Sequence, residues 1–144
     1  MSTVNSYLQL LVGPQRRALM ELLAYLSAVD GEVSFEEVIF IAEVSNQLGV
    51  DETAGELIDA VAEKGLDDVC ACFDADQVKA IALAELVSIA WADGTYDASE
   101  RDGVRAIGQA MSVSEETIVS LEGWVERGEA WESEGRRLLG GHGG

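Results

Sequence analysis

The sequence predicts an all-α protein, a single domain made of two tandem three-helix repeats. Apolar residues recur at helical spacing along most of the chain, and no segment shows the alternation of a strand. One pattern of residues also occurs twice at a constant offset. The only proline, Pro14, lies near the start, so the rest of the chain can form helices without interruption.

The repeat is the strongest signal in the sequence. Ala28-Val29-Asp30-Gly31 aligns with Trp91-Ala92-Asp93-Gly94 at an offset of 63 residues. The same offset aligns further pairs without gaps, and a chance match would not hold this register. The two copies are predicted at about residues 15–65 and 77–128, within one all-helical domain of residues 1–139. The aligned pairs include Leu23 with Leu86, Glu37 with Glu100, Val44 with Ile107, Leu48 with Met111 and Val50 with Val113.

Each copy is predicted to begin with a helix, over about Gln15–Val29 and Gln77–Ala92. Gly31 and Gly94 then supply the left-handed residue that commonly ends a helix. Leu19, Leu22, Leu23 and Leu26 line one face of the first of these helices, and Val78, Ile81, Leu86 and Ile89 line one face of the second.

The second helix of each copy is predicted to start with a capping box. Ser34 is followed three residues later by Glu37, and Asp97 is followed by Glu100. Gly49 is expected to end the first of these helices. Their core faces are predicted from Ile41, Val44 and Leu48 and from Val104, Ile107 and Met111.

The third helix is predicted to start near Asp51 or Ser114, both favourable N-cap residues, and to stop at Gly65 or Gly128. Trp124 and Trp131 are interpreted as anchors of the last helix, with Trp131 alternatively on a partner surface. A short helical linker is expected over about Leu66–Phe73, with Asp74 or Asp76 capping the next helix, and residues 140–144 form a glycine-rich tail that we expect to be disordered.

The chain is strongly acidic, with 27 Asp and Glu against 9 Lys and Arg and a formal charge of −18. Such a surface repels phosphate backbones and anionic lipids, so we expect no nucleic acid partner and no direct membrane insertion. Cations and basic protein surfaces are the partners that this charge favours. The alternative is that the charge serves solubility alone.

The two cysteines, Cys70 and Cys72, are one residue apart, and the only histidine is His142. A structural zinc site needs about four ligands, so zinc of that kind is not expected. We interpret the cysteines as reduced thiols in a reducing compartment. Because the N-terminus lacks the pattern of a secretory signal, the predicted location is cytoplasmic.

The Asp-Gly segments carry the candidate chemistry. An Asp at a helix C-terminus is repelled by the helix dipole, so a backbone amide, the next helix N-terminus or a bound cation must compensate it. Calcium and magnesium prefer clustered carboxylate and carbonyl oxygens. The alternative is that capping bonds and Asx turns use the same side chains without metal. The candidate metal ligands are Asp30, Glu37, Asp93, Asp97 and Glu100.

An EF-hand loop also ends in Asp-Gly, five residues and Glu, and both copies reproduce that second half. The first half does not fit. Its first two acidic positions are occupied by Leu26 and Ala28 in one copy, and by Ile89 and Trp91 in the other. These residues are core positions of a helix, so a high-affinity EF-hand is not expected.

Two helical units that each carry Ala/Val-Asp-Gly, with a Glu six residues after the Gly, resemble the TerB family over roughly Arg16 to Gly128. The resemblance implies a small helical adaptor for responses to tellurite, other chemical stress or phage. It further implies divalent cation binding and assembly with partner proteins, some of them membrane-associated. The matching positions are Asp30 with Glu37 and Asp93 with Glu100.

The sequence does not predict an enzyme. It contains no core histidine, no glycine-rich phosphate loop and no Gly-x-Ser-x-Gly motif. The expectation is therefore either a cation-binding adaptor or an acidic interaction scaffold that needs no metal.

Overall fold

A computed structural model describes residues 10–28, 35–91 and 96–140, apart from a few side chains at the helix ends. The described residues form helices and no strand, which confirms the predicted all-α class. The helices are α1 (Gly13–Ala28), α2 (Phe35–Leu48), α3 (Ala54–Lys64), α4 (Leu66–Cys70), α5 (Asp76–Trp91), α6 (Ala98–Ala110) and α7 (Glu115–Leu138).

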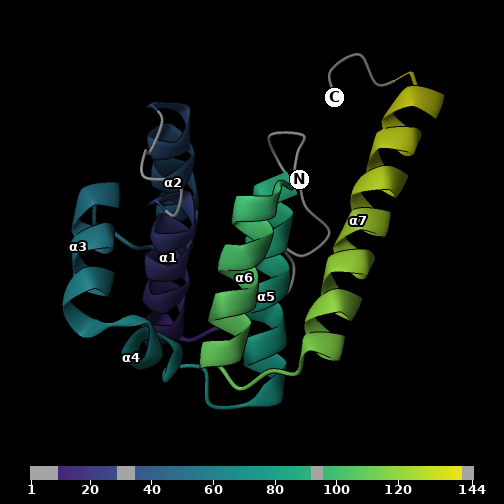
Figure 1. Cartoon of the computed structure of the whole chain (residues 1–144). Coiled ribbons are helices and arrows are strands. Elements are labelled where there is room, and N and C mark those ends of the chain that lie inside the picture. The colour runs from purple at the N-terminus through teal and green to yellow at the C-terminus, as the bar shows by residue number, and fades with distance from the viewer. Residues whose placement is uncertain (1–9, 29–34, 92–95, 141–144) are drawn as a thin grey trace.

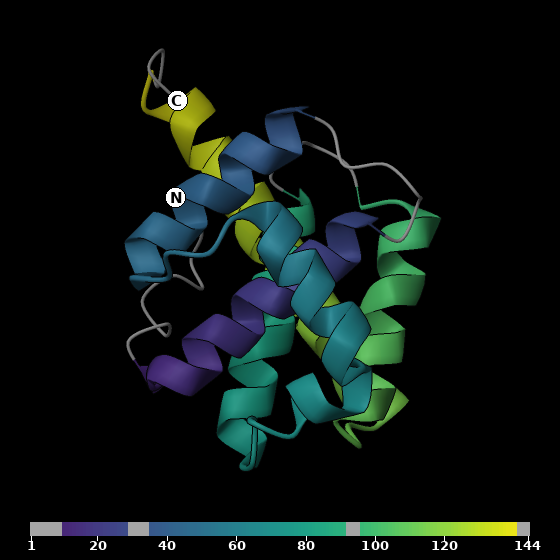
Figure 2. The same cartoon turned by 90° about the vertical axis from the view of Figure 1, so that its left-hand side faces the viewer.

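The helices form two groups that lie side by side (Figure 1). In the first group α1 packs against α3 and α2, and in the second α5 packs against α7 and α6. The short helix α4 lies at the base, where it contacts α1, α3 and α6. Figure 2 shows α3 in front of α1, on the side of the molecule opposite α7. The groups meet where α1 contacts α6 and α5.

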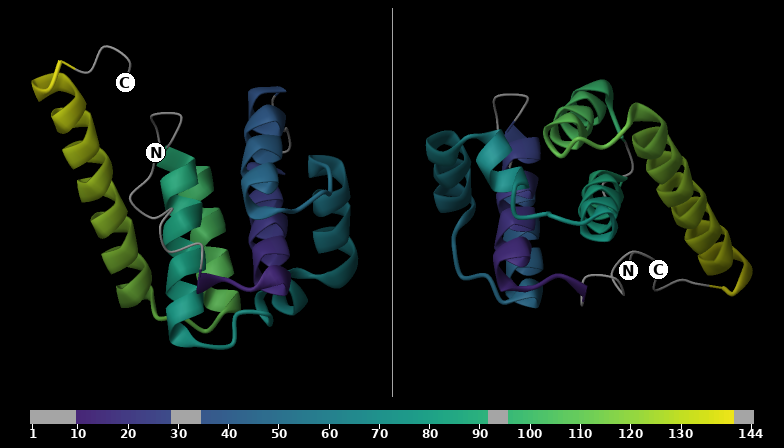
Figure 3. Two further views of the ribbon diagram at one scale, coloured as in Figure 1. Left: turned by 180° about the vertical axis from the view of Figure 1, so that it is seen from behind. Right: turned by 90° about the horizontal axis from the view of Figure 1, so that it is seen from below.

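The first helix of each group is buried on all sides along its middle. Residues 18–24 of α1 and 81–88 of α5 are all buried, as expected for helices that other helices surround. The view from below in Figure 3 shows α5 between the α1 side and α7. The predicted core residues Leu19, Ile41 and Ile107 are among the fully buried ones.

The turns that follow α2 and α6 have the same geometry. Gly49 and Ser112 both adopt left-handed backbone, with φ of 75° and 62°. In each turn the amide of the next residue donates to the carbonyl oxygen five residues earlier, at 2.8 Å after Gly49 and 2.9 Å after Ser112. Gly49 thus ends α2 as predicted.

The boundaries of the third helices differ from the predicted ones. α3 begins after Thr53 and not near Asp51, because the Thr53 side chain and Glu56 form a complete capping box. Ser114 does cap α7, but that helix continues through Gly128 to Leu138. A glycine in a helix interior costs only about 1 kcal/mol relative to alanine, which neighbouring contacts readily offset.

The linker is shorter than predicted, since α4 ends at Cys70 and a turn leads to the buried Phe73. Both cysteines are free thiols, Cys70 buried and Cys72 exposed. Within the described ranges, no helix has the length and apolar composition required to cross a membrane.

Exchanging the two left-handed residues should change stability in opposite directions. Ser112→Gly should raise the free energy of unfolding by up to about 1 kcal/mol, because a residue with a Cβ is strained at this φ. Gly49→Ser should lower it by a similar amount. Urea unfolding of both variants and of Gly49→Ser/Ser112→Gly measures the effects. Equal shifts of the same sign in the two single variants would contradict this account.

Candidate functional site

The structure describes two of the five candidate metal ligands in full. Asp97 and Glu100 lie together at the start of α6. Asp30 and Asp93 lie outside the described residues, with Gly31, Gly94 and the predicted cap Ser34. Glu37 lies in the first turn of α2, and its side chain is outside the described set. The proposed cation site at the Asp-Gly turns therefore stays a prediction.

Asp97 and Glu100 form the predicted capping box. Asp97 Oδ1 accepts a hydrogen bond from the Glu100 amide at 2.9 Å, and the Asp97 amide donates to Glu100 Oε1 at 3.2 Å. The same reciprocal pair occurs at Thr53 and Glu56, with distances of 3.1 and 3.0 Å. The α3 pair follows no Asp-Gly segment, so this chain uses the capping box as a general device for starting helices.

The capping box engages one carboxylate oxygen of Asp97 and one of Glu100. Over the part of the chain that the structure describes, no group of three or more His, Cys, Asp or Glu side chains is arranged to hold a metal ion. A cation at this turn would thus need oxygen ligands from the preceding Asp-Gly residues.

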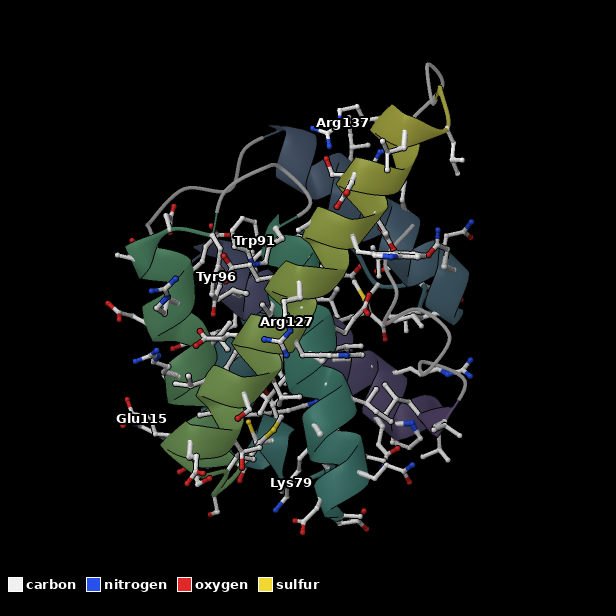
Figure 4. All side chains as sticks on the ribbon, turned by 90° about the vertical axis from the view of Figure 1, so that its right-hand side faces the viewer. Lys79, Trp91, Tyr96, Glu115, Arg127 and Arg137 are labelled. Carbon is white, nitrogen blue, oxygen red and sulfur yellow. The ribbon has the colours of Figure 1, made fainter. Side chains whose placement is uncertain are left out.

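A polar network adjoins Asp97 and connects α6 to α7. The Tyr96 hydroxyl donates to Glu122 Oε2 at 2.6 Å, and Arg105 Nη2 lies 3.3 Å from Glu122 Oε1. The Arg101 guanidinium lies 5.1 Å from the centre of the Tyr96 ring, and the Trp91 ring centre is 6.0 Å away. Figure 4 shows Trp91 and Tyr96 beside α7, where α5 ends and α6 begins.

This network fixes the protonation state of Tyr96. Burial, and then the hydrogen bond to Glu122, raises the pKa of Tyr96 well above its usual range. The hydroxyl therefore remains a neutral donor, and the two arginines balance the Glu122 carboxylate. Sequence reasoning missed these residues because their contacts join side chains 17 to 26 residues apart, beyond the reach of a local helical pattern. The available signal was a tyrosine at the apolar position after Asp-Gly.

A second polar group is buried between α5 and α7. Glu85 is 3% exposed, and its Oε2 atom accepts no hydrogen bond from the residues that the structure describes. One turn further along α5, Ser88 Oγ donates to Glu129 Oε1 of α7 at 3.4 Å. Burial, and then the nearby Glu129, raises the pKa of Glu85 from 4.5 to about 7. Glu85 therefore holds a proton under conditions in which ordinary carboxyls are ionised.

The buried glutamate of the first group has a different partner. Glu21 of α1 is 2% exposed, and its carboxylate lies 2.9 Å from Lys64 Nζ of α3. A buried charge needs such a counter-charge, whereas Glu85 faces an acid and takes up a proton. The two interfaces are thus similar in layout and opposite in electrostatics.

Comparison of the chain with family models, curated proteins and solved structures gives no match.

The raised pKa of Glu85 predicts a specific pH dependence. Between pH 4.5 and 7 the folded protein holds a proton that the unfolded chain has released, so this group lowers stability as the pH rises. The loss is complete above about pH 7 and amounts to about 3 kcal/mol. Glu85→Gln removes the titration, so its stability should fall less than that of the wild type between pH 5 and 8. Urea unfolding at both pH values measures the difference.

The control is Glu126→Gln, which neutralises an exposed glutamate of α7. It should retain the wild-type difference between the two pH values. Parallel pH profiles of the wild type and Glu85→Gln would show that Glu85 does not titrate in this range.

Proposed function

We propose that this chain is a stress-response adaptor of the TerB-like kind, which assembles with protein partners through an acidic helical surface. The observation that carries the proposal is the charge of the segment from Asp51 to Asp76, which contains α3, α4 and the start of α5. It holds nine acidic residues and a single basic one, Lys64. We call this segment's surface the α3–α4 acidic face.

The acidic residues of this face are directed to solvent. Eight of the nine are exposed: Asp51, Glu56, Asp59, Glu63, Asp67, Asp68, Asp74 and Asp76. Lys64 does not neutralise them, because its ammonium group pairs with the buried Glu21. A concentration of one charge sign steers oppositely charged proteins toward a surface and selects among them. The expected partner therefore presents a basic surface.

The duplicated unit is part of the same proposal. α1 and α5 differ by 63 residues at both ends, and the turns after α2 and α6 lie at the same offset with the same hydrogen bonds. These agreements support two copies of one three-helix unit, with α7 as the longer form of α3. On this proposal the adaptor consists of two related three-helix halves, and the α3–α4 acidic face lies mainly on the first of them.

Divalent cation binding at the Asp-Gly turns is the second candidate function. It is favoured by the position of Asp97 three residues after Gly94, where Oδ2 lies outside the capping box. Together with Asp93 and Glu100 this oxygen would contribute to a site for calcium or magnesium. In the first copy the corresponding residues are Asp30 and Glu37.

Neutralising the acidic face should weaken partner capture. The variant Asp59→Asn/Glu63→Gln/Asp67→Asn/Asp68→Asn loses four charges from the α3–α4 acidic face, and capture of a partner in affinity purification should fall at least about tenfold. A matched variant loses four exposed charges elsewhere: Glu43→Gln/Asp102→Asn/Glu116→Gln/Glu126→Gln. Equal capture by the two variants would refute a specific role for the face.

Cation binding is tested by thermal unfolding of the full chain in calcium, magnesium or manganese against chelator. A ligand at a hundred times its Kd should add about 2.7 kcal/mol to the free energy of unfolding. Asp97→Asn keeps a side-chain oxygen for the N-cap but removes the charge, so it should retain the stability in chelator and lose most of the metal-dependent shift. No shift of the wild type with any of the three ions would refute the cation site and leave the adaptor proposal intact.

A further inference from the structure

The outer part of α7 exposes large apolar side chains. Trp131 is 72% exposed and Leu138 is 69% exposed. Figure 1 shows that the C-terminal half of α7 leans away from α5 and α6. Single exposed leucines are common on proteins, but a tryptophan exposed to this degree together with other apolar residues on one helix marks an interaction surface.

These residues belong to a regular stripe, which we call the α7 seam. The stripe has spacings of four, three, four and three residues, the pattern of a helix face that packs against another helix. It differs from the core face of α7, where Ile118 and Val125 are buried. Large residues and glycines alternate along the seam, which consists of Trp124, Gly128, Trp131, Gly135 and Leu138.

Gly135 has no role in the packing of the described chain. A Cβ atom built at this position would meet no atom within 4 Å. Glycine in a helix interior is nevertheless less favourable than alanine by about 1 kcal/mol. Close approach of another backbone or of a large side chain is a common reason for such a glycine. The space beside Gly135 lies next to Trp131, on the same face.

The local charge indicates which partner would cover the seam. Residues 124–138 contain four glutamates and three arginines, a net charge of −1 in a chain of −18. A basic partner would find little net attraction here, in contrast to the α3–α4 acidic face. A surface with charges of both signs is complementary to a second copy of itself if the signs alternate in the right register.

An antiparallel pair of α7 helices provides that register. With Trp131 of one copy against Gly128 of the other, Trp124 lies against Gly135 of the second copy. Trp124 then fills the open space beside Gly135, and Trp131 lies against Gly128. A parallel pair would place tryptophan on tryptophan and glycine on glycine, which packs poorly.

The flanking charges favour the same register. Arg127 and Glu134 flank the seam on one side, and neither forms an ion pair with another described residue. Figure 4 shows Arg127 on the side of α7 that faces away from α5. In an antiparallel pair the residues on this side face each other, so Arg127 of each copy meets Glu134 of the other. Moving the register so that Trp131 faces Gly135 would instead place Glu134 against Glu134.

We propose that the α7 seam is a self-association surface through which two copies of this chain pair their α7 helices antiparallel, tryptophan against glycine. This proposal concerns a different surface from the α3–α4 acidic face. The two proposals therefore fail separately.

Sedimentation equilibrium of the full chain at concentrations from about 5 to 500 μM tests the proposal, a range that covers the affinities of small interfaces. The mass should rise from 15.4 kDa toward twice that value. Trp131→Ser should raise the dimer dissociation constant at least about tenfold. The control Val119→Ser changes another exposed apolar residue of α7, 49% exposed and outside the seam, and should leave the constant unchanged.

A charge exchange tests the register. Arg127→Glu and Glu134→Arg should each weaken dimerisation, because like charges then face each other twice. The double variant Arg127→Glu/Glu134→Arg restores both ion pairs and should restore the wild-type constant. If the effects of the two single variants on the dissociation constant simply add up in the double variant, the antiparallel arrangement is overturned.

Gly135→Leu separates association from folding. The space beside Gly135 is open within the described chain, so the melting temperature of the monomer should not fall, whereas the dimer should dissociate at least about tenfold more readily. The variant that neutralises four residues of the α3–α4 acidic face should dimerise like the wild type. A wild-type chain that stays monomeric over the whole range would overturn the proposal. In that monomer, a blue-shifted difference between the emission of the wild type and that of Trp131→Ser would show that another part of the same chain covers Trp131.

Discussion

Two helices, α1 and α5, are buried on every side along their middle, and the rest of the structure is arranged to cover them. A helix in this position has no solvated face, so every polar group on it must find its partner inside the protein. Each of the two carries one buried glutamate, Glu21 and Glu85. The covering helices α3 and α7 place different residues next to those glutamates, and this difference makes the two halves of the molecule electrostatically different.

In the first half of the molecule, the buried glutamate Glu21 lies next to a residue of opposite charge. Lys64 reaches from the last turn of α3 to Glu21, which ties α3 to the core and engages the single basic residue of the α3–α4 acidic face. One ion pair thus stabilises an interface and unmasks the acidic face. In the second half α7 offers Glu129, so Glu85 is held as a protonated acid and the α5–α7 contact gains no ion pair at this point. α7 is instead tied near its start, by the contacts of Glu122 with Tyr96 and Arg105.

The local features of this fold could be predicted from the sequence, and the non-local ones could not. Helical spacing located one buried face of α1 and of α5 but not the burial of their other sides, and Gly49 marked the end of α2. The Asp97–Glu100 capping box is a contact over three residues, so its pattern is readable. The predicted end of α7 at Gly128 was wrong, since the helix continues to Leu138. A glycine favours the end of a helix only weakly, and tertiary contacts that a linear pattern does not contain can override it. Tyr96 and Glu122 are 26 residues apart, and nothing in their spacing indicates that they meet.

The distribution of charge separates two kinds of surface on one small protein. The α3–α4 acidic face acts through long-range attraction, which salt screens over about 8 Å at physiological ionic strength. The α7 seam carries almost no net charge, so its pairing depends mainly on apolar burial and on steric fit at short range, with the Arg127–Glu134 pairs at its edge. Salt that weakens the first interaction also reduces the repulsion between two copies of charge −18 and so favours the second. Opposite responses to salt are therefore expected from two surfaces that lie on opposite sides of the same bundle.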